Sequence, residues 1–487
     1  MTVVASRENF PLLAELLAEQ QRLDTPVARF STTVDRTLPA APGTRHASLL
    51  PLSRPGPGEQ YAFEVDLDAC SGCKSCVAAC HSLNGLDEAE TWREVGLLLS
   101  PDAGHPFAQT VTAACHHCAE PACLHGCPVL AYEKDPITGI VRHLDDQCIG
   151  CSYCILKCPY DVPKYSARLG IVRKCDLCHG RLAAGEAPAC AQACPTQAIR
   201  IVTVPAGGAA DGGRFLPAAP DPGYTRPTTR YLSRRGLPPN LVAADAATLR
   251  VQPAHWPLVV LLTAFPAAVG CSLAAALRSG GTVVGTEDVK LAAVVFGAAG
   301  LAASGFHLGQ PRRAWRIFLG WRRSWLSREA LLCGGWFGLA VAALVFPAIT
   351  LVAAAVGLAG LACSAMIYVD TRRHFWRAGQ TFPRFFGTAA LVAAGLLVPW
   401  AAALILIALL AWEHRTRAPD DVSARLQRGP LRRLVAVRTG LGLAGAVLLA
   451  IGPGPGTLAV VLAAELAGRL LYFRAVDAPK MPGLPTA

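Results

Sequence analysis

The chain has 487 residues and a formal net charge of +11; 52% of its residues are hydrophobic and only 16% are charged. The length excludes a single compact domain, and the low charged fraction, against about a quarter in ordinary soluble proteins, places part of the chain in a membrane. The positive charge does not indicate a nucleic-acid binder, because most arginines lie between apolar runs rather than on one basic face.

Residues 1–60 are predicted to form an N-terminal extension without an export signal, because they hold no basic stretch before an apolar core and no twin arginine. Within this extension, residues 9–22 carry leucines on one side and predict a short amphipathic helix. We expect this helix to pack on its own chain, with docking to a partner subunit as the alternative.

Sixteen of the 19 cysteines fall between residues 70 and 194, in four sets of four. In every set two cysteines lie close together, a third is near, and three residues separate the third from the fourth. In chain order the sets are Cys70, Cys73, Cys76 and Cys80; Cys115, Cys118, Cys123 and Cys127; Cys148, Cys151, Cys154 and Cys158; and Cys175, Cys178, Cys190 and Cys194.

The run C-x2-C-x2-C-x3-C is typical of bacterial ferredoxins, in which three thiolates bind one iron–sulfur cube and the fourth binds its neighbour. A proline follows the fourth cysteine in three sets (Pro128, Pro159 and Pro195), and His81 takes that place in the first. We therefore predict four [4Fe–4S] clusters, and no [3Fe–4S] centre because no set lacks a cysteine. Zinc is the main alternative, and disulfides fit poorly without an export signal.

Around the sets, residues 61–202 show repeated short strand–turn–helix units, which predict an α+β double ferredoxin-like iron–sulfur domain. Cations beside the sets would raise the cluster potentials, or would be ordinary solvated charges; they are Lys74, Lys157, Arg173, Lys174 and Arg181. Histidines near the cysteines are expected to be hydrogen-bond donors or surface residues rather than ligands.

Residues 203–254 are rich in Gly and Pro and are expected to be an extended linker. Residues 255–475 hold apolar runs long enough to span a membrane, and residues 476–487 form a tail. The run 385–412 is long for one helix, so we predict an all-α transmembrane bundle of eight helices, with seven as the alternative. Eight helices place the arginine-rich connections, and the iron–sulfur domain with them, on the cytoplasmic side of the inner membrane.

His307 ends the second apolar run, at a membrane boundary, where a titratable side chain is a functional candidate. An imidazole there could bind a quinone oxygen and pass a proton. Glu329 is a candidate partner, and the alternative for both is an ordinary polar residue at the end of a helix. Glu465 lies deeper in its run and is expected to pair with Arg469 at i+4.

The cysteine sets, together with "CPVLAYEKDPITGIVRHLDDQCIGC" and "CPYDVPKYSARLGIVRKCDLC", resemble the four-cluster electron-transfer subunit of the dimethyl sulfoxide reductase family of membrane molybdoenzymes. The second half, with "HLGQPRRAW", "LSREA" and "AELAGRLLYF", resembles the membrane-anchor subunit of that family. These subunits are usually separate chains, so this chain resembles a natural fusion of the two.

The resemblance implies that sets one and four share two clusters and that sets two and three share the other two. The implied ligand groups are Cys70, Cys73, Cys76 and Cys194; Cys175, Cys178, Cys190 and Cys80; Cys115, Cys118, Cys123 and Cys158; and Cys148, Cys151, Cys154 and Cys127. The resemblance also implies quinol binding near His307 and Glu329, and a molybdopterin cofactor held only by a separate catalytic subunit.

We therefore expect an electron-transfer and anchor subunit, itself non-catalytic, that links a membrane quinone pool to a partner molybdopterin oxidoreductase through four clusters. The arginine placement resembles the sulfite dehydrogenases of the family more than the outward-facing dimethyl sulfoxide reductases. An iron–sulfur subunit fused to an ion-translocating membrane arm is the alternative function, and a zinc-stabilised membrane scaffold is the non-redox one.

Overall fold

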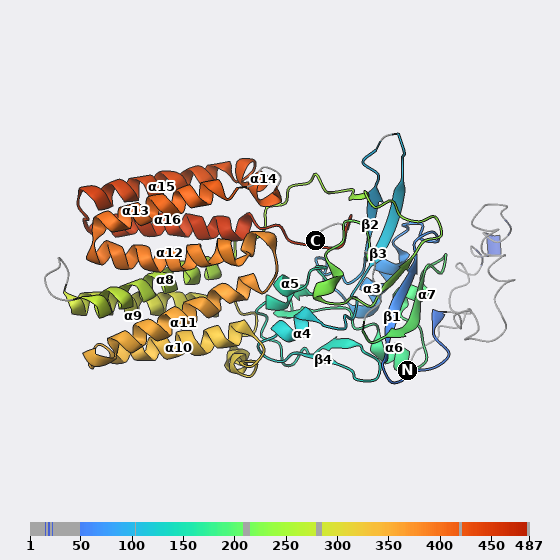
Figure 1. Ribbon diagram of the computed structural model, residues 1–487. Coiled ribbons are helices and arrows are strands. Elements are labelled where there is room, and N and C mark those ends of the chain that lie inside the picture. The colour runs from blue at the N-terminus through green and yellow to red at the C-terminus, as the bar shows by residue number, and fades with distance from the viewer. Residues whose placement is uncertain are drawn as a thin grey trace.

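The computed structural model of the protein describes residues 49–102, 104–207, 215–278, 285–417 and 421–484, with Glu15, Ala18, Glu19 and Arg22. The amphipathic helix predicted at residues 9–22 therefore lies almost wholly outside the described residues. The described chain forms an α/β part and a helical bundle that lie end to end (Figure 1).

Two three-stranded sheets and two short hairpins build the α/β part. In the first sheet β1 (Glu59–Asp66) lies between β8 (Ile199–Pro205), which is antiparallel to it, and β9 (Arg230–Leu232), which is parallel. In the second sheet β2 (Glu94–Leu99) lies between β3 (Ala108–Ala113) and β10 (Val242–Ala243). The hairpins pair β4 (Tyr132–Lys134) with β5 (Val141–His143) and β6 (Lys164–Ser166) with β7 (Ile171–Arg173).

Five short helices in this part carry or adjoin the cysteines; they are α3 (Ser75–Asn84), α4 (Ala122–Gly126), α5 (Tyr153–Lys157), α6 (His179–Ala183) and α7 (Ala189–Gln192). Buried thiols lie in the same hydrophobic cluster as Phe63, Val65 and Leu98. The core of the α/β part thus combines apolar strand residues with cysteines.

The segments on either side of the bundle pack on the α/β part. β9 and β10 come from residues 203–254, which the composition predicted to be an extended linker, so this segment completes both sheets. Beyond the last helix, Met481 and Leu484 are buried, and the carbonyl of Gly483 accepts a hydrogen bond from the Leu97 N–H of β2 at 3.2 Å. The bundle is thus fastened to the α/β part from both ends of its own sequence.

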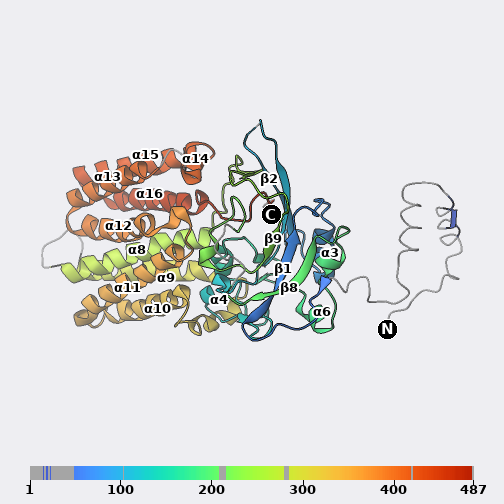
Figure 2. The ribbon, with the colours of Figure 1, turned by 45° about the vertical axis from the view of Figure 1, so that its right-hand side comes forward.

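The bundle contains eight helices of 17 to 22 residues in the described chain: α8 (Trp256–Leu277), α9 (Thr286–Gly305), α10 (Trp325–Ala342), α11 (Thr350–Val369), α12 (Ala378–Leu397), α13 (Pro399–Arg415), α15 (Arg432–Ile451) and α16 (Pro455–Arg474). The short α14 (Val422–Arg428) precedes α15. In Figure 2, α8 lies between the group of α9 to α11 and the group of α12 to α16. Most residues of α8 are buried, which places this helix at the centre of the apolar core of the bundle.

Among the described residues, five segments are long and apolar enough to cross a membrane, judged by length and composition: Trp256–Leu277, Thr286–Gly305, Pro347–Val369, Arg432–Ile451 and Gly456–Arg474. The long run at 385–412 is divided between α12 and α13 at Val398. Pro399 begins α13 there because the first position of a helix needs no N–H donor. The α/β part is thus followed by a helical region with five candidate membrane spans.

The connection between α9 and α10, which contains the 3₁₀ helix η4 (Pro311–Phe318), joins the two parts. Its backbone N–H groups at Gln310 and Gly320 donate to the carbonyls of Ile149 (3.0 Å) and Pro128 (2.8 Å) in the cysteine-rich loops. On the other side of the contact Lys157 Nζ donates to Asp370 Oδ2 at 2.6 Å. The contact is dense because the backbones of Gly150, Gly170 and Gly309 meet without side chains between them.

Gly309→Ala is predicted to weaken this contact, because the added Cβ would overlap the carbonyl of Gly170 and the hydroxyl of Tyr165. Overpacking of this kind costs about 1–3 kcal/mol. The measurement is thermal denaturation of the purified full-length protein in detergent, where the midpoint should fall. Gly305→Ala is the matched control, because a Cβ at Gly305 meets nothing within 4 Å. Equal midpoints for the two variants would contradict the prediction.

Candidate cluster sites and the bundle interface

Cysteines that are far apart in the sequence line common cavities in the α/β part. Site 1 is lined by Cys70, Cys73, Cys76 and Cys194. Site 2 is lined by Cys80, Cys175, Cys178 and Cys190, and site 3 by Cys115, Cys118, Cys123 and Cys158. These are the groups that the family resemblance implies, with the fourth cysteine of each set exchanged between paired sets.

Site 4 is formed by the remaining four cysteines. Cys127, Cys148 and Cys154 are buried in one cluster, and the partly buried Cys151 packs against it. Burial raises the pKa of the Cys127 thiol to about 11, and the neighbouring Cys148 thiol acts in the same direction. The four thiols of site 4 are therefore close enough to act on one another.

The backbone explains how the short cysteine runs bring three thiols together. In the first run Gly72 and Lys74 have positive φ angles of 73° and 62°, and in the third run Gly150 and Ser152, at the same positions, have 70° and 58°. Each left-handed residue turns the chain back on itself between successive cysteines. The run then enters α3 or α5, and the fourth cysteine leaves toward the neighbouring site, as with Cys76 in site 1 and Cys80 in site 2.

The residues present fit iron–sulfur clusters. Burial raises the pKa of Cys80 to about 12 and that of Cys158 to about 11, and none of the described cysteines forms a disulfide. Buried thiols that crowd one another become thiolates only when a cationic centre accompanies them. Within the described residues no three or more Cys, His, Asp or Glu side chains close on one point as the ligands of a single ion would; the thiols instead surround shared spaces.

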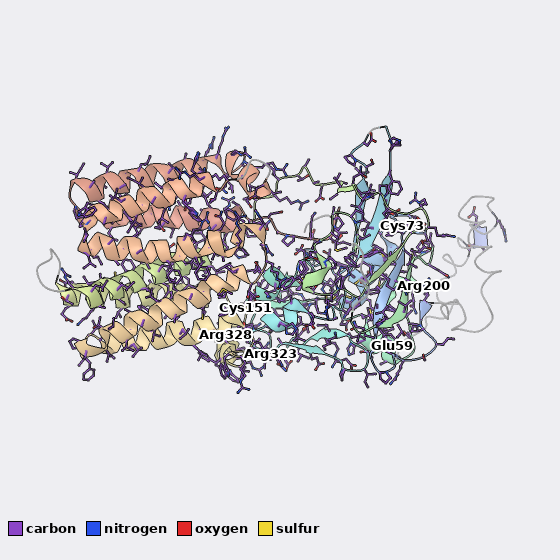
Figure 3. The ribbon with its side chains drawn as sticks, viewed as in Figure 1. Glu59, Cys73, Cys151, Arg200, Arg323 and Arg328 are labelled. Carbon is purple, nitrogen blue, oxygen red and sulfur yellow. The ribbon has the colours of Figure 1, made fainter. Side chains whose placement is uncertain are left out.

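Electrostatic interactions among the thiols and Tyr132 indicate the order of the sites. The Cys76 thiol of site 1 lies near that of Cys190 in site 2, and Cys175 of site 2 lies near Cys115 of site 3. Tyr132 lies near Cys123 of site 3 and Cys154 of site 4. Figure 3 places Cys151 beside the bundle and Cys73, which is exposed, on the far side of the α/β part. The sites therefore run from an exposed surface, through sites 2 and 3, to the bundle.

His307 lies directly against site 4. Its Nε2 atom is 2.8 Å from the carbonyl oxygen of Cys151, and its ring centroid is 6.3 Å from that of His255. Because a carbonyl only accepts, Nε2 carries the proton in this contact, which leaves Nδ1 as the free acceptor of a neutral ring.

Glu329 has a different partner. It is buried in α10, where Ser364 of α11 is its hydrogen-bond partner. Among the described side chains His307 and Glu329 share no hydrogen bond or ion pair. The structure thus brings His307 to a cysteine site and gives Glu329 a partner on α11.

The cations beside the cysteine sets differ in their surroundings. Lys157 is paired with Asp370, Arg173 with Glu90 at 2.7 Å, and Arg181 with Glu186 at 3.0 Å. Lys74 is exposed, whereas Lys174 is buried with its Nζ 3.6 Å from the Cys115 sulfur. Among the nearby histidines, His116 Nδ1 contacts Thr229 Oγ1 and His117 Nδ1 accepts from the Val141 N–H, while the Nε2 atoms of both are buried without a hydrogen-bond partner among the described residues.

A network of buried charges lies inside the bundle, and most of it was missed by reading the sequence. Glu465 lies 4.0 Å from Arg469, as expected at i+4, but its nearer partner is Arg438 of α15 at 2.8 Å. Arg438 also pairs with Glu413 of α13 at 3.3 Å, and Arg469 donates to Thr388 of α12 at 2.7 Å. These partners come from four helices, so only the folded bundle brings them together.

Comparison with known proteins supports an iron–sulfur domain in this part of the chain. The 4Fe-4S dicluster domain family matches residues 107–204. The chain is similar to a subunit of the anaerobic dimethyl sulfoxide reductase of Haemophilus influenzae, with 38% identity over 155 residues, which is 30% of this chain and 75% of the relative. It is also similar to YnfG of Escherichia coli K12, a probable anaerobic dimethyl sulfoxide reductase subunit, with 38% identity over 29% of this chain and 73% of the relative.

A more distant similarity is to the formate dehydrogenase-O iron-sulfur subunit of Escherichia coli K12, with 33% identity over 30% of this chain and 54% of the relative. The protein is thus an iron–sulfur electron-transfer subunit of an oxidoreductase, with a [4Fe–4S] domain followed by apolar helices. Within that class, it belongs to the dimethyl sulfoxide reductase family of iron–sulfur subunits.

The grouping of the thiols predicts which substitutions act on the same cluster. Cys115→Ser and Cys158→Ser should each remove the same spectral component and roughly a quarter of the iron, because both residues line site 3. The measurement is iron analysis with low-temperature electron paramagnetic resonance of the reduced protein. Cys363→Ser, in the bundle, is the control and should change neither. If Cys158→Ser instead removed the component lost in Cys148→Ser, the assignment of site 3 would be wrong.

Proposed function

We propose that the chain carries electrons through four [4Fe–4S] clusters between a partner molybdopterin oxidoreductase and a membrane quinone pool, and that its bundle anchors this complex. The observation that carries the proposal is the line of four thiol sites that begins at an exposed surface and ends at His307. Clusters held in such sites supply carriers for single electrons. The sixteen cysteines of the four sets are the proposed ligands.

The exposed end of the line suits the catalytic partner. Cys73 of site 1 is exposed, and Cys70 and Cys194 are partly so, whereas most thiols of sites 2 to 4 are buried. A partner bound over this end would shield site 1 from water. The chain itself already shields the inner sites in this way. The similarity to subunits of a dimethyl sulfoxide reductase and a formate dehydrogenase supports a molybdopterin-containing partner, and a sulfite dehydrogenase is the further variant.

The other end of the line suits quinone. Oxidation of a quinol releases two electrons and two protons, so a proton acceptor is needed beside the last electron carrier. His307 offers Nδ1 as that acceptor while its Nε2–H holds the ring against Cys151. Glu329, buried one helix further on, is proposed as a second polar group facing the quinone, acting separately from His307.

Several features support an anchor in the inner membrane with the α/β part on the cytoplasmic side. The five apolar spans suit a bilayer. The connection after α9 exposes Trp315, Phe318 and Trp321 beside its arginines, as segments at a membrane interface do. Figure 3 shows Arg323 and Arg328 at the end of the bundle that meets the α/β part. All eight long helices are proposed to cross, since this keeps the arginine-rich connections on one side.

His307→Ala is expected to slow reoxidation of the reduced clusters by a quinone analogue by about 100-fold or more, because a positioned proton-transfer group is lost. The spectra of the four clusters should persist. Stopped-flow absorbance of the purified protein measures the rate. His374→Ala is the matched control, because His374 is mostly exposed and its ring pairs with Asp421 and Arg377 rather than with a cysteine loop. A wild-type rate in His307→Ala would remove His307 from the quinone site.

The buried charge network favours a second candidate function, an iron–sulfur subunit fused to an ion-translocating arm. Charged side chains inside a membrane are costly and mark ion or proton paths more often than lipid contacts. Glu413, Arg438 and Glu465 connect three helices, α13, α15 and α16, through their ion pairs. The same network would serve helix packing alone if no ion passes through it.

Under this second function, Glu465→Gln abolishes proton movement beyond that of quinone chemistry while electron transfer continues. The ratio of protons to electrons is measured in proteoliposomes with an internal pH-sensitive dye. Glu287→Gln is the control, because Glu287 is 66% exposed at the start of α9. An unchanged ratio in Glu465→Gln would leave electron transfer and anchoring as the whole function.

A further inference from the structure

Arg93 is a buried cation that lies outside the cysteine runs. It directly precedes β2 and is 2% exposed, with its guanidinium carbon 4.4 Å from the centroid of the Phe63 ring. Its Nη1 donates to Thr112 Oγ1 at 3.1 Å, and this hydroxyl lies 3.7 Å from the Cys76 sulfur of site 1. Arg93 therefore lies behind site 1 and is held there by a ring and a hydroxyl.

The charge of Arg93 is not neutralised by a carboxylate of the described chain. None of the described acidic side chains forms an ion pair with it, and its Nε and Nη2 have no hydrogen-bond partner among the described residues. Leaving two guanidinium donors buried and unpaired is unfavourable, unless an acceptor that belongs to the site receives them. Arg93 also lines site 2, so an acceptor held by the thiols of that cavity would be within its reach.

The electrostatics agree with this geometry. Burial lowers the pKa of Arg93, but the thiols of Cys190, Cys76, Cys175 and Cys80 outweigh that effect and raise it overall. Three of these four thiols belong to site 2. Since the field of a charge is weakly screened in a buried site, Arg93 acts on site 2 far more strongly than an exposed cation would.

We propose that Arg93 sets the reduction potential of the cluster in site 2, by placing an unpaired positive charge and two N–H donors in that cavity. The inference rests on the proposed function, because it requires site 2 to hold a cluster. A reduced cluster carries one more negative charge than an oxidised one. A buried cation and N–H donors to sulfur stabilise that added charge and raise the potential.

Lys174 holds the corresponding place at site 3. It is 3% exposed; its Nζ lies 3.6 Å from Cys115 and donates to the carbonyl of Cys175 at 2.8 Å. Lys174 Nζ donates hydrogen bonds to two backbone carbonyls. In contrast, Nε and Nη2 of Arg93 have no acceptor among the described residues. The two middle sites of the line thus each have a buried cation. Arg93 acts mainly on cysteines of site 2 and Lys174 mainly on Cys115 and Cys123 of site 3, although both also act on Cys175.

The test is a redox titration of the purified full-length protein, followed by electron paramagnetic resonance, with iron and sulfide content measured in parallel. Arg93→Met should lower the midpoint potential of one component and leave the component of site 4 unchanged. Lys174→Met is the reciprocal control and should lower the potential of a different component. Arg93→Lys, which keeps the charge but loses the fork of donors, should shift the same component as Arg93→Met by a smaller amount.

The outcomes separate this inference from the proposed function. If wild-type protein held no iron, the proposed function would fail. If the variants held full iron and Arg93→Met left every potential unchanged, or shifted the same component as Lys174→Met, the role of Arg93 would be refuted. Should Arg93→Met lose iron, Arg93→Gln carries the test: a lowered potential in one component supports the inference, and unchanged potentials overturn it.

Discussion

The gathering of sixteen thiols, most of them buried, in one small α/β part is the constraint on which the rest of the structure depends. Thiolates that crowd one another in an apolar core are stable only beside positive charge, so the sheets and short helices serve mainly to hold loops around the four sites. Left-handed residues at matching positions in the first and third runs, Gly72 and Gly150 among them, turn those loops inward. The strands supply apolar core residues around these sites, Phe63, Val65 and Leu98 among them.

The contact between the two parts follows from the position of site 4. Site 4 must lie at the bundle if electrons are to reach a membrane carrier, and the connection after α9 reaches it through backbone hydrogen bonds and meeting glycines. His307 is part of that same connection, so the residue proposed to take a proton is fixed by the contact that brings the two parts together. The strands β9 and β10 and the C-terminal tail also pack on the α/β part. The position of His307 at site 4 therefore depends on both parts being joined in one chain.

Buried charge is used in two different ways in this chain. In the α/β part Arg93 and Lys174 lie beside thiols, and their positive charge acts on the cysteine sites. In the bundle Arg438 and Arg469 face carboxylates, and the network is nearly neutral. The physical reason is charge balance. A cation paired with a carboxylate stabilises the contact between its helices, whereas an unpaired cation stabilises negative charge on a neighbouring group.

The sequence by itself determined the cysteine sets, the class of cofactor and the apolar helices, because ligand spacing and hydrophobic length are local properties of the chain. It also marked His307 as a residue at a boundary. Only the tertiary structure decided that residues of the linker complete both sheets, that Arg93 lines site 2, and that Arg438 joins Glu413 to Glu465. Those contacts join residues far apart in the chain, and no local pattern of charge or spacing encodes a partner that only folding brings near.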